Sequence, residues 1–448
     1  MKIIIVGAGV AGLSAYLQLK KLMPGRHTIL IYEAYGSRAT GDRSPSEPML
    51  TDSAAVVGNV IALVPAALRM LRCINQDLYD LFLTRGYQNE TYRFRTARGH
   101  SLGAVPTDDG ESPRECTVSC PRMVLRDCLV EIVGEHNIHY RRVVAVDVSG
   151  PKTIVKFADG SQESADLVLG ADGVRSVVRT AILGPARDAA EFPPHYEGFC
   201  GVGGFLQMDE LPQPALEKSI VFTFGPAGSF GYCSVGPLEQ RMLGWWSNWG
   251  QAEMPRSNVM GLEEIRRQLR DRHGAWEDPI IGHVVENMTT DRIYPIWTTP
   301  ELPCWSRGGA VLLGDAAHTL PATSGQGAAQ ALEDSIVFCL LLAAYLGQDG
   351  VSETEAAQLA GKGLFELQAP RAAAIKRRSR NLYLTNKRID KVAVEYAYYA
   401  YLYLLTRLPI LSRLVLGTVF SPSDHKDPEQ RVRDYLGVKK AREEAREE

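Results

Sequence analysis

The sequence lacks the features of a metal-binding, disulfide-stapled or nucleic-acid-binding protein. Its eight cysteines are scattered, and none forms a CxxC pair or lies at zinc spacing from a histidine. Several of them sit inside apolar runs, such as Cys339 in IVFCLLLAAYL, where a free thiol behaves as a small hydrophobe. This usage fits a reducing compartment, and we expect a cytoplasmic protein without a metal site. The formal net charge of -3 gives no electrostatic argument for nucleic acid.

Long uninterrupted hydrophobic runs are also missing. The opening MKIIIVGAGVAGL contains four apolar residues, Ile3–Val6, before glycines break it, so it predicts a first β-strand rather than a secretory signal. Residues 396–420 are the most hydrophobic stretch, but Arg407, Pro409 and Arg413 interrupt it below the roughly 20 apolar residues of a membrane span. We expect this stretch to pack on a neighbouring domain or to form a homodimer surface. A weak membrane contact is the less favoured alternative.

The 448 residues, 45% hydrophobic and 23% charged, have room for two or three domain-sized units. A βαβ unit is predicted at the start, with strands Lys2–Val6 and Thr28–Tyr32 around a helix at Ala11–Leu22. Two further buried strands are predicted at 165–171 and Ala310–Leu313. Between about 185 and 300, strand-like runs alternate with Gly/Pro turns around one helix near Leu262–Arg272, which predicts an inserted antiparallel sheet.

The fold class is therefore α/β. A Rossmann-like domain, residues 1–184, resumes at 301–352 after an inserted antiparallel-sheet domain at 185–300, and a helical C-terminal region follows at 353–448. Residues 36–55, polar and rich in Gly, Pro and Ser, are predicted to be a loop that could carry binding groups.

The segment GAGVAG joins the first strand to the first helix. Gly7, Gly9 and Gly12 let the backbone turn tightly and approach a pyrophosphate, whose charge rests on the helix N-terminus. Glu33 follows Gly12 by twenty-one residues and ends the next strand, where a carboxylate can bind ribose hydroxyls. A plain Gly-rich turn is the alternative, and the strand, helix and acid together make it the weaker one. The fingerprint alone does not choose between FAD and NAD.

Two more strands end in acidic or Gly-rich loops. Asp172-Gly173 follows the strand at 165–171, although alone it would indicate only a turn, and LLGDAAHTLPATSGQGAAQALED carries Asp315 after the strand at Ala310–Leu313. Ligands lie outside the carboxyl ends of parallel strands, so an elongated ligand such as FAD would use all three loops. Asp315 could bond a ribityl hydroxyl, and the helix from Gly327 would point its positive end at the flavin ring.

These motifs together resemble the class A flavoprotein monooxygenases, the group of para-hydroxybenzoate and salicylate hydroxylases. The residues that carry the resemblance are GAGVAG with Glu33, VSCPRMVLRDCLVEIV with Arg122, GADGVRS at 170–176 and the long segment at 312–334. The resemblance implies that Arg122 helps to hold FAD, that Asp172 serves FAD and transient NAD(P)H binding, and that Asp315 binds the ribityl chain. GNVIALVPAAL at 58–68 departs from the family, which usually has Asn where Ala66 stands.

The predicted activity is an FAD-dependent monooxygenase that consumes NADPH or NADH and binds FAD non-covalently. By resemblance, one atom of O2 passes through a flavin C4a-hydroperoxide to a phenol, an indole or a fused aromatic or polyketide-like compound, as in secondary metabolism. The alternatives are a reductase or halogenase of the same fold, or a redox-silent binding protein. The predicted partners are small molecules, with the chain a monomer or a homodimer.

His318 is expected to be structural, and the cluster of Trp245, Trp246 and Trp249 is either a substrate wall or core packing. The remaining candidates form two groups, one for the substrate and one for the cofactor. Candidates for contact with the substrate are Tyr232, Arg292 and Pro321. The predicted cofactor-binding residues are Gly7, Gly9, Gly12, Glu33, Arg122, Asp172, Gly173, Gly314, Asp315, Gly325, Gly327 and Ala328.

Overall fold

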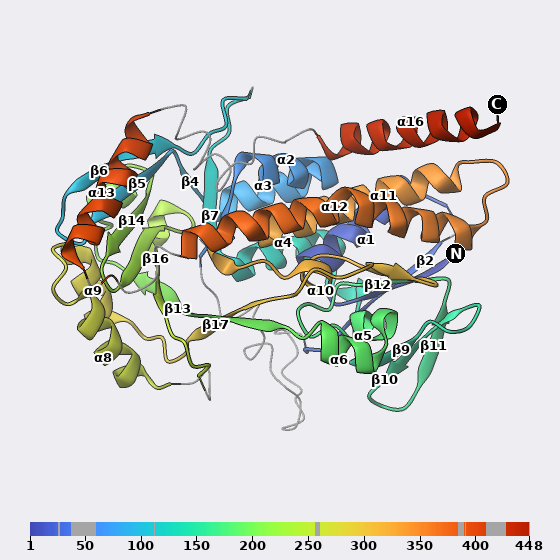
Figure 1. Cartoon of the computed structure of the whole chain (residues 1–448), viewed down its shortest axis with the longest axis horizontal. Coiled ribbons are helices and arrows are strands. Elements are labelled where there is room, and N and C mark those ends of the chain that lie inside the picture. The colour runs from blue at the N-terminus through green and yellow to red at the C-terminus, as the bar shows by residue number, and fades with distance from the viewer. Residues whose placement is uncertain are drawn as a thin grey trace.

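The computed structural model describes residues 1–25, 27–36, 60–111, 113–255, 260–383, 389, 391–408 and 427–447. They form two lobes around two large sheets, with the long helices of the C-terminal half lying over the first sheet and α13 (Val392–Arg407) on the second (Figure 1). Most of the polar loop predicted at 36–55, and the later part of the apolar stretch at 396–420, lie outside the described residues.

The first sheet has the order β18-β19-β12-β1-β2-β8. Its strands are β1 (Lys2–Val6), β2 (Thr28–Glu33), β8 (Ile138–Tyr140), β12 (Leu167–Gly170), β18 (Ser306–Arg307) and β19 (Ala310–Leu312). β1 pairs in parallel with β2 and β12, and β12 pairs in parallel with β19. This confirms the predicted α/β sheet, whose central strands are continuous apolar runs because helices cover them.

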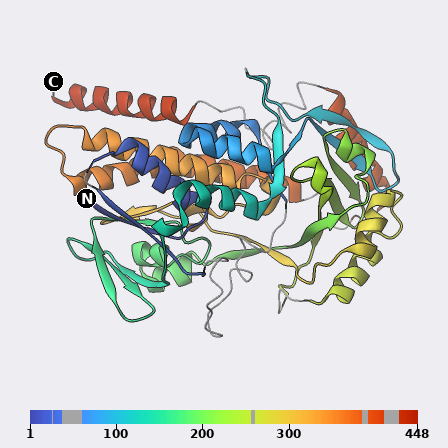
Figure 2. The same ribbon diagram turned by 180° about the vertical axis from the view of Figure 1, so that it is seen from behind.

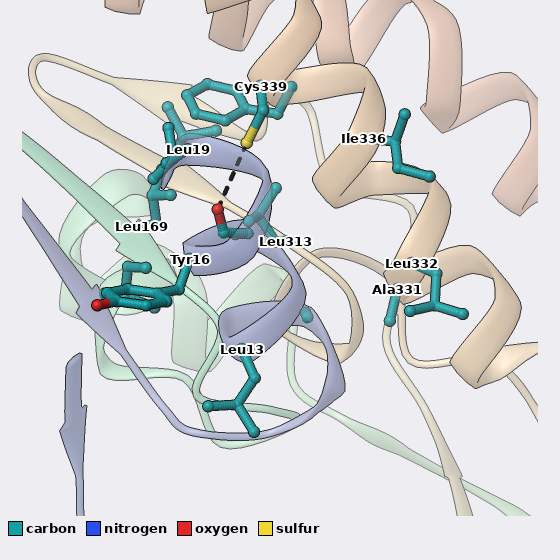
Figure 3. Close-up of a cluster of buried hydrophobic side chains, with 14 of the residues drawn as sticks. Leu13, Tyr16, Leu19, Leu169, Leu313, Ala331, Leu332, Ile336 and Cys339 are labelled. Atoms are coloured by element: carbon teal, nitrogen blue, oxygen red, sulfur yellow. Dashed lines mark hydrogen bonds between the residues drawn. The ribbon is translucent and has the colours of Figure 1, made fainter. Parts of the chain in front are cut away.

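The helices that cover this sheet form the main core. α1 (Val10–Leu22) and α11 (Gly327–Leu346) lie against each other, and Leu13, Leu19, Leu332 and Ile336 belong to one cluster of buried residues (Figure 3). α11 is the one helix among the described residues that is long and apolar enough to cross a membrane, but most of it is buried against α1 and α12 (Glu353–Tyr383). The length and hydrophobicity of α11 therefore reflect its place in the core.

The second sheet has the order β17-β13-β16-β15-β14-β5-β6. Five strands come from the predicted insertion: β13 (His195–Gln207), β14 (Ser219–Gly225), β15 (Gly228–Ser234), β16 (Met242–Gly250) and β17 (Tyr294–Thr298). β5 (Thr91–Thr96) and β6 (Ser101–Pro106) join them from the segment that the sequence analysis assigned to the first domain. β5 pairs in parallel with β14, so the sheet is mixed and not purely antiparallel. The sequence missed this pairing because it joins segments more than a hundred residues apart.

Two helices, α8 (Leu262–His273) and α9 (Pro279–Asn287), cover one face of this sheet (Figure 2). The sequence predicts only the first of them, near Leu262–Arg272. On the other face the sheet meets α13 and the small sheet β3-β7-β4, which leads back to the lobe of the first sheet. The remaining elements are β3 (Val60–Leu63), α2 (Pro65–Ile74), α3 (Gln76–Arg85), β4 (Tyr87–Asn89), β7 (Thr117–Pro121), α4 (Arg122–Val133), β9 (Val143–Asp147), β10 (Thr153–Phe157), β11 (Gln162–Ala165), α5 (Val177–Leu183), α6 (Pro185–Glu191), α7 (Gln213–Leu216), α10 (Asp315–His318) and α16 (Pro428–Glu447).

Candidate active site

The glycine loop between β1 and α1 packs directly on the loop after β12. A Cβ on Gly7, whose φ is +105°, would lie 2.3 Å from the carbonyl oxygen of Ala171, and a Cβ on Gly12 would lie 2.0 Å from the carbonyl oxygen of Gly7. Gly9 differs, because a Cβ there would meet no heavy atom within 4 Å. Gly7 and Gly12 thus close the turn, while Gly9 faces open space at the N-terminus of α1, where a pyrophosphate could approach.

The carboxylate of Glu33 holds the same loop from the adjacent strand. Its two oxygens accept hydrogen bonds from the backbone N–H groups of Ala8, at 2.8 Å, and Tyr35, at 3.0 Å. Since each carboxylate oxygen can accept more than one hydrogen bond, Glu33 keeps capacity for ribose hydroxyls. Glu33 therefore lies beside the glycine loop, and its contact with a ribose stays a prediction.

Asp172 follows β12 and has two separate roles. One oxygen, Oδ2, accepts hydrogen bonds from the backbone N–H groups of Val177 and Val178 and so caps the start of α5. The other, Oδ1, is buried and has no hydrogen-bond partner among the described residues, and burial raises the pKa of this carboxyl. A buried acceptor without a partner is costly. Asp172 thus caps α5 and keeps one buried oxygen unpaired, and its contact with FAD stays a prediction.

The loop after β19 meets the glycine loop from the other side. Gly314, with φ of +59°, packs so closely that a Cβ there would lie 3.2 Å from the Cβ of Ala11. Asp315 starts α10, and among the described residues no hydrogen-bond partner of its carboxylate is found. Three loops that are far apart in the sequence therefore converge at the carboxyl ends of β1, β12 and β19.

The N-terminus of α11 completes this group. Gly325 has φ of +64°, and a Cβ on Gly325 or Gly327 would meet no heavy atom within 4 Å. Gln326 precedes the helix without a side-chain cap, and Ala328 is half-buried in its first turn. Free N–H groups at the start of a twenty-residue helix favour negative charge, and the open space in front of them suits a flat ring.

A buried polar network fixes this loop to the C-terminal helices. Asp334 on α11 accepts hydrogen bonds from the Gly314 N–H, at 2.8 Å, and from Gln368 on α12, and its Oδ2 lies 2.6 Å from His318 Nε2. Gln368 in turn accepts a hydrogen bond from Arg431 on α16. The expectation that His318 is structural is confirmed.

α4 contributes one predicted residue and one that the sequence analysis missed. Arg122 is the first residue of α4 and its side chain is exposed, so its FAD contact stays a prediction. Arg126, one turn later, donates from Nε to the Ala8 carbonyl at 3.1 Å, and its buried Nη2 has no partner among the described residues. The i, i+4 spacing from Arg122 was the available signal, because both residues then lie on one helix face.

The two faces of the seven-stranded sheet decide which aromatic residues can meet a substrate. Successive side chains of a strand point to opposite faces. Trp245 and Trp249 are buried against α8 and α9, whereas Trp246 is half-buried on the opposite face, the one that β3 and β7 approach. The tryptophan cluster is therefore divided: two members are core, and Trp246 is the one available to a ligand.

Trp246 belongs to an aromatic row on that face. Its ring is 5.5 Å from Phe222, edge to face, and Phe222 stacks on Phe224 and Phe94. The indole lies over Gly231, where a Cβ would be 2.3 Å from the ring. The half-buried rings, which we call the aromatic face, are Phe205, Phe222, Phe224, Trp246 and, from α13, Tyr398.

Tyr232 was predicted to contact the substrate, and the structure argues against it. Its side chain is fully buried on the α8/α9 face, and its hydroxyl donates to Asp278 Oδ2 at 3.1 Å. The prediction failed because the strand period places Tyr232 opposite to its neighbour Cys233. Pro321 lies in the loop that leads to Gly325, and Arg292 lies before β17 near Asp291; both stay predictions.

The residues present fit FAD. The glycine loop, the free oxygens of Asp172 and Asp315 and the uncapped start of α11 offer acceptors, donors and space along one elongated path.

Comparisons with known proteins agree. The family described as "FAD binding domain" matches residues 131–356. Salicylate hydroxylase of Pseudomonas putida is 26% identical over 84% of this chain and 83% of its own.

A second relative is similar over a shorter region. Aurachin C monooxygenase/isomerase of Stigmatella aurantiaca is 31% identical over 56% of this chain, and the match spans 62% of that protein. Among solved structures, Klebsiella pneumoniae HpxO complexed with FAD and uric acid superposes with a TM-score of 0.72 at 21% identity, covering 94% of this chain and 97% of that one. A salicylate hydroxylase substrate complex gives 0.71 at 17% identity, over 97% and 98%. These two structures share the fold.

Proposed function

Because the chain belongs to the FAD-binding-domain family, and within it to the class A flavoprotein monooxygenases, we propose that it oxidises NAD(P)H and inserts one oxygen atom of O2 into an electron-rich aromatic compound. The observation that carries the choice of substrate is the aromatic face. Half-exposed rings such as Trp246 and Phe222, stacked on the side of the sheet that leads to the FAD-binding lobe, gain burial and ring contacts from a flat apolar ligand.

FAD, when bound, supplies the transfer of electrons from NAD(P)H to O2. The chain's own residues bind and orient. Glu33 is suited to ribose hydroxyls, Asp172 and Asp315 to further donors of the cofactor, and the N–H groups that start α11 to negative charge at the far end. The aromatic face would exclude water from the substrate and hold the reacting carbon in place. We further propose that FAD is held without a covalent link.

Incorporation of labelled oxygen tests the reaction itself. The purified protein, supplied with NADPH and a panel of phenols, indoles and fused aromatic compounds, is expected to oxidise NADPH faster when the correct compound is present. Under labelled O2, mass spectrometry should find one labelled oxygen atom in the product. A product formed equally well without oxygen would contradict the proposal and support a reductase. Acid precipitation should release the flavin into the supernatant if the link is non-covalent.

The aromatic face has a matched test. Trp246→Ala should raise the KM for the substrate while FAD content stays unchanged, because it removes a ring from the ligand side of the sheet. The control is Trp276→Ala, which removes a half-buried tryptophan packed against His273 on the α8/α9 side. Equal effects of the two variants on KM would mean that the aromatic face does not contact the substrate.

A further inference from the structure

The helix α13 carries an unusual concentration of exposed apolar side chains. Of the thirteen large hydrophobic residues that are exposed in the described part of the chain, seven lie on α13 or directly after it. They are Val392, Val394, Tyr396, Tyr401, Tyr403, Leu404 and Leu408, with exposed fractions between 43% and 60%. Scattered single residues of this kind are normal on a protein surface, but a contiguous set marks an interaction site.

The side of α13 that faces the second sheet fixes the exposed residues outward. The Tyr399 hydroxyl shares its one hydrogen between the Phe224 carbonyl, at 3.1 Å, and Glu395 Oε1, at 2.8 Å. Thr406 donates to the Leu102 carbonyl at 2.5 Å. Tyr399, Leu402 and Leu405 are buried on the second sheet. α13 therefore cannot turn its apolar residues inward without losing these contacts, so the exposed row belongs to the docked helix.

The exposed surface of α13 has no acidic side chain among the described residues. Glu395, the one acid of the helix, is 4% exposed and bound to Tyr399. Lys391 and Arg407 flank the helix at its two ends and are exposed. Arg98 of the adjacent strand turn is 48% exposed, with its Nε 3.8 Å from Glu395 Oε1. Tyrosines on an apolar helix with basic residues beside them are typical of the membrane–water interface.

The width of the surface indicates what covers it. At 3.6 residues per turn, the exposed residues of α13 occupy about 200° of the helix circumference, and Arg407 is the one charged residue between them. A partner helix needs only a narrow stripe, whereas a non-directional apolar medium can cover a wide arc. The sixteen residues of α13 are fewer than the roughly 20 that a span requires.

We propose that α13 is a monotopic membrane-docking helix that lies in the interface of a bilayer containing anionic lipids. Its apolar and tyrosine side chains enter the acyl boundary, and Lys391, Arg407 and Arg98 contact lipid headgroups. Its buried side carries Tyr398, which packs edge to face on Phe224, so the docked helix would hold the aromatic face beside the lipid.

Vesicle flotation of the full-length, FAD-loaded protein tests the proposal. The probes are vesicles of phosphatidylcholine alone and vesicles in which part of it is replaced by phosphatidylserine. We expect binding to the anionic vesicles and at least tenfold weaker binding to the neutral ones, with the difference falling as salt screens the basic residues. Failure of the full-length protein to float with anionic vesicles overturns the proposal.

A triple variant on one row of the helix, Tyr401→Ser, Leu404→Ser and Leu408→Ser, should lower binding about tenfold or more, because it removes apolar area from the membrane side. The control, Leu83→Ser, Val144→Ser and Leu238→Ser, alters similarly exposed residues elsewhere and should bind as the parent does. Flavin content and thermal unfolding show whether both variants fold. If the triple variant does not fold, Tyr401→Ser alone replaces it and is expected to weaken vesicle binding less.

Two results would contradict the proposal. One is equal loss of vesicle binding in the α13 variant and in its control, which would mean that general hydrophobicity drives binding. The other is a concentration-dependent dimer, measured by sedimentation velocity, that the α13 variant abolishes while the parent does not bind vesicles. That result would assign the surface to a second copy of this chain.

Discussion

The FAD-binding lobe and the seven-stranded sheet make room for a ligand in opposite ways. In the lobe the room comes from missing side chains, because a Cβ at Gly9 or Gly327 would meet nothing within 4 Å, and polar oxygens at the strand ends surround that room. In the sheet the proposed ligand surface consists of large rings on one face, among them Trp246, while Trp245 on the other face is fully buried. A site lined by backbone requires glycine at particular positions. A site lined by side chains depends on which face of each strand points into the core.

The largest expected effect separates the two faces of the sheet. Trp245→Ala should lower the free energy of unfolding by about 3–5 kcal/mol, because it empties part of the core that stacks on Phe230. Trp246→Ala should cost a fraction of that, since its ring is half-buried. Denaturant unfolding of both variants measures the difference. A larger loss for Trp246→Ala would show that the face toward α13 is the structural one.

The next largest effect is a difference in stability between substitutions at two glycines of the lobe, Gly12 and Gly9. Gly12→Ala places a Cβ 2.0 Å from the Gly7 carbonyl oxygen, so the loop must shift, and we expect a loss of about 1–3 kcal/mol in stability together with weaker FAD binding. Gly9→Ala should leave the stability of the FAD-free protein unchanged and weaken FAD binding alone. Thermal unfolding with and without FAD distinguishes them. Identical behaviour of the two variants would mean that Gly9 does not face the cofactor.

Asp315→Ala tests a side chain of the lobe instead of its backbone. Loss of an acceptor for a buried hydroxyl should weaken FAD binding by about 1–3 kcal/mol with the fold intact. Asp349→Ala, which changes an exposed aspartate after α11, is the control and should bind FAD as the parent does. Fluorescence titration of the FAD-free protein gives the dissociation constants. Unchanged affinity in Asp315→Ala would move the ribityl site to another residue.

The smallest effect is the pH dependence of the stability that the buried pair of His318 and Asp334 contributes. Burial disfavours the charged form of His318, but the Asp334 carboxylate at 2.6 Å outweighs it and raises the pKa above 6.5. The contribution of protonated His318 to the free energy of unfolding is therefore complete below about pH 6.5 and is lost as pH rises through the raised pKa. Over that range the free energy of unfolding should fall by at most about 1.4 kcal/mol per pH unit. Thermal unfolding from about pH 6 to about pH 9 should show this slope in the parent and not in His318→Gln. A flat profile in the parent would mean that His318 is neutral throughout.

Much of the lobe could be predicted from the sequence because local rules govern it. The strand β1, the turn at Gly7 and the helix α1 were predicted with nearly correct bounds, since apolar runs, glycines and helical periodicity act over a few residues. Arg126 was missed because its contact with the Ala8 carbonyl joins residues more than a hundred positions apart. The same limit explains β5 and β6, whose place in the second sheet depends on hydrogen bonds to β14.

The sequence by itself determined that three strands end in Gly-rich or acidic loops and that one of those loops is a dinucleotide fingerprint, because glycine alone tolerates the backbone angles and close approaches found at Gly7 and Gly12. Only the tertiary structure decided that Trp246 lies half-buried on one face of the sheet and Tyr232 fully buried on the other, and that α13 turns apolar residues outward. Strand alternation gives each residue one of two faces, but which face is inward is set by the helices and strands that pack against it, and those come from distant parts of the chain.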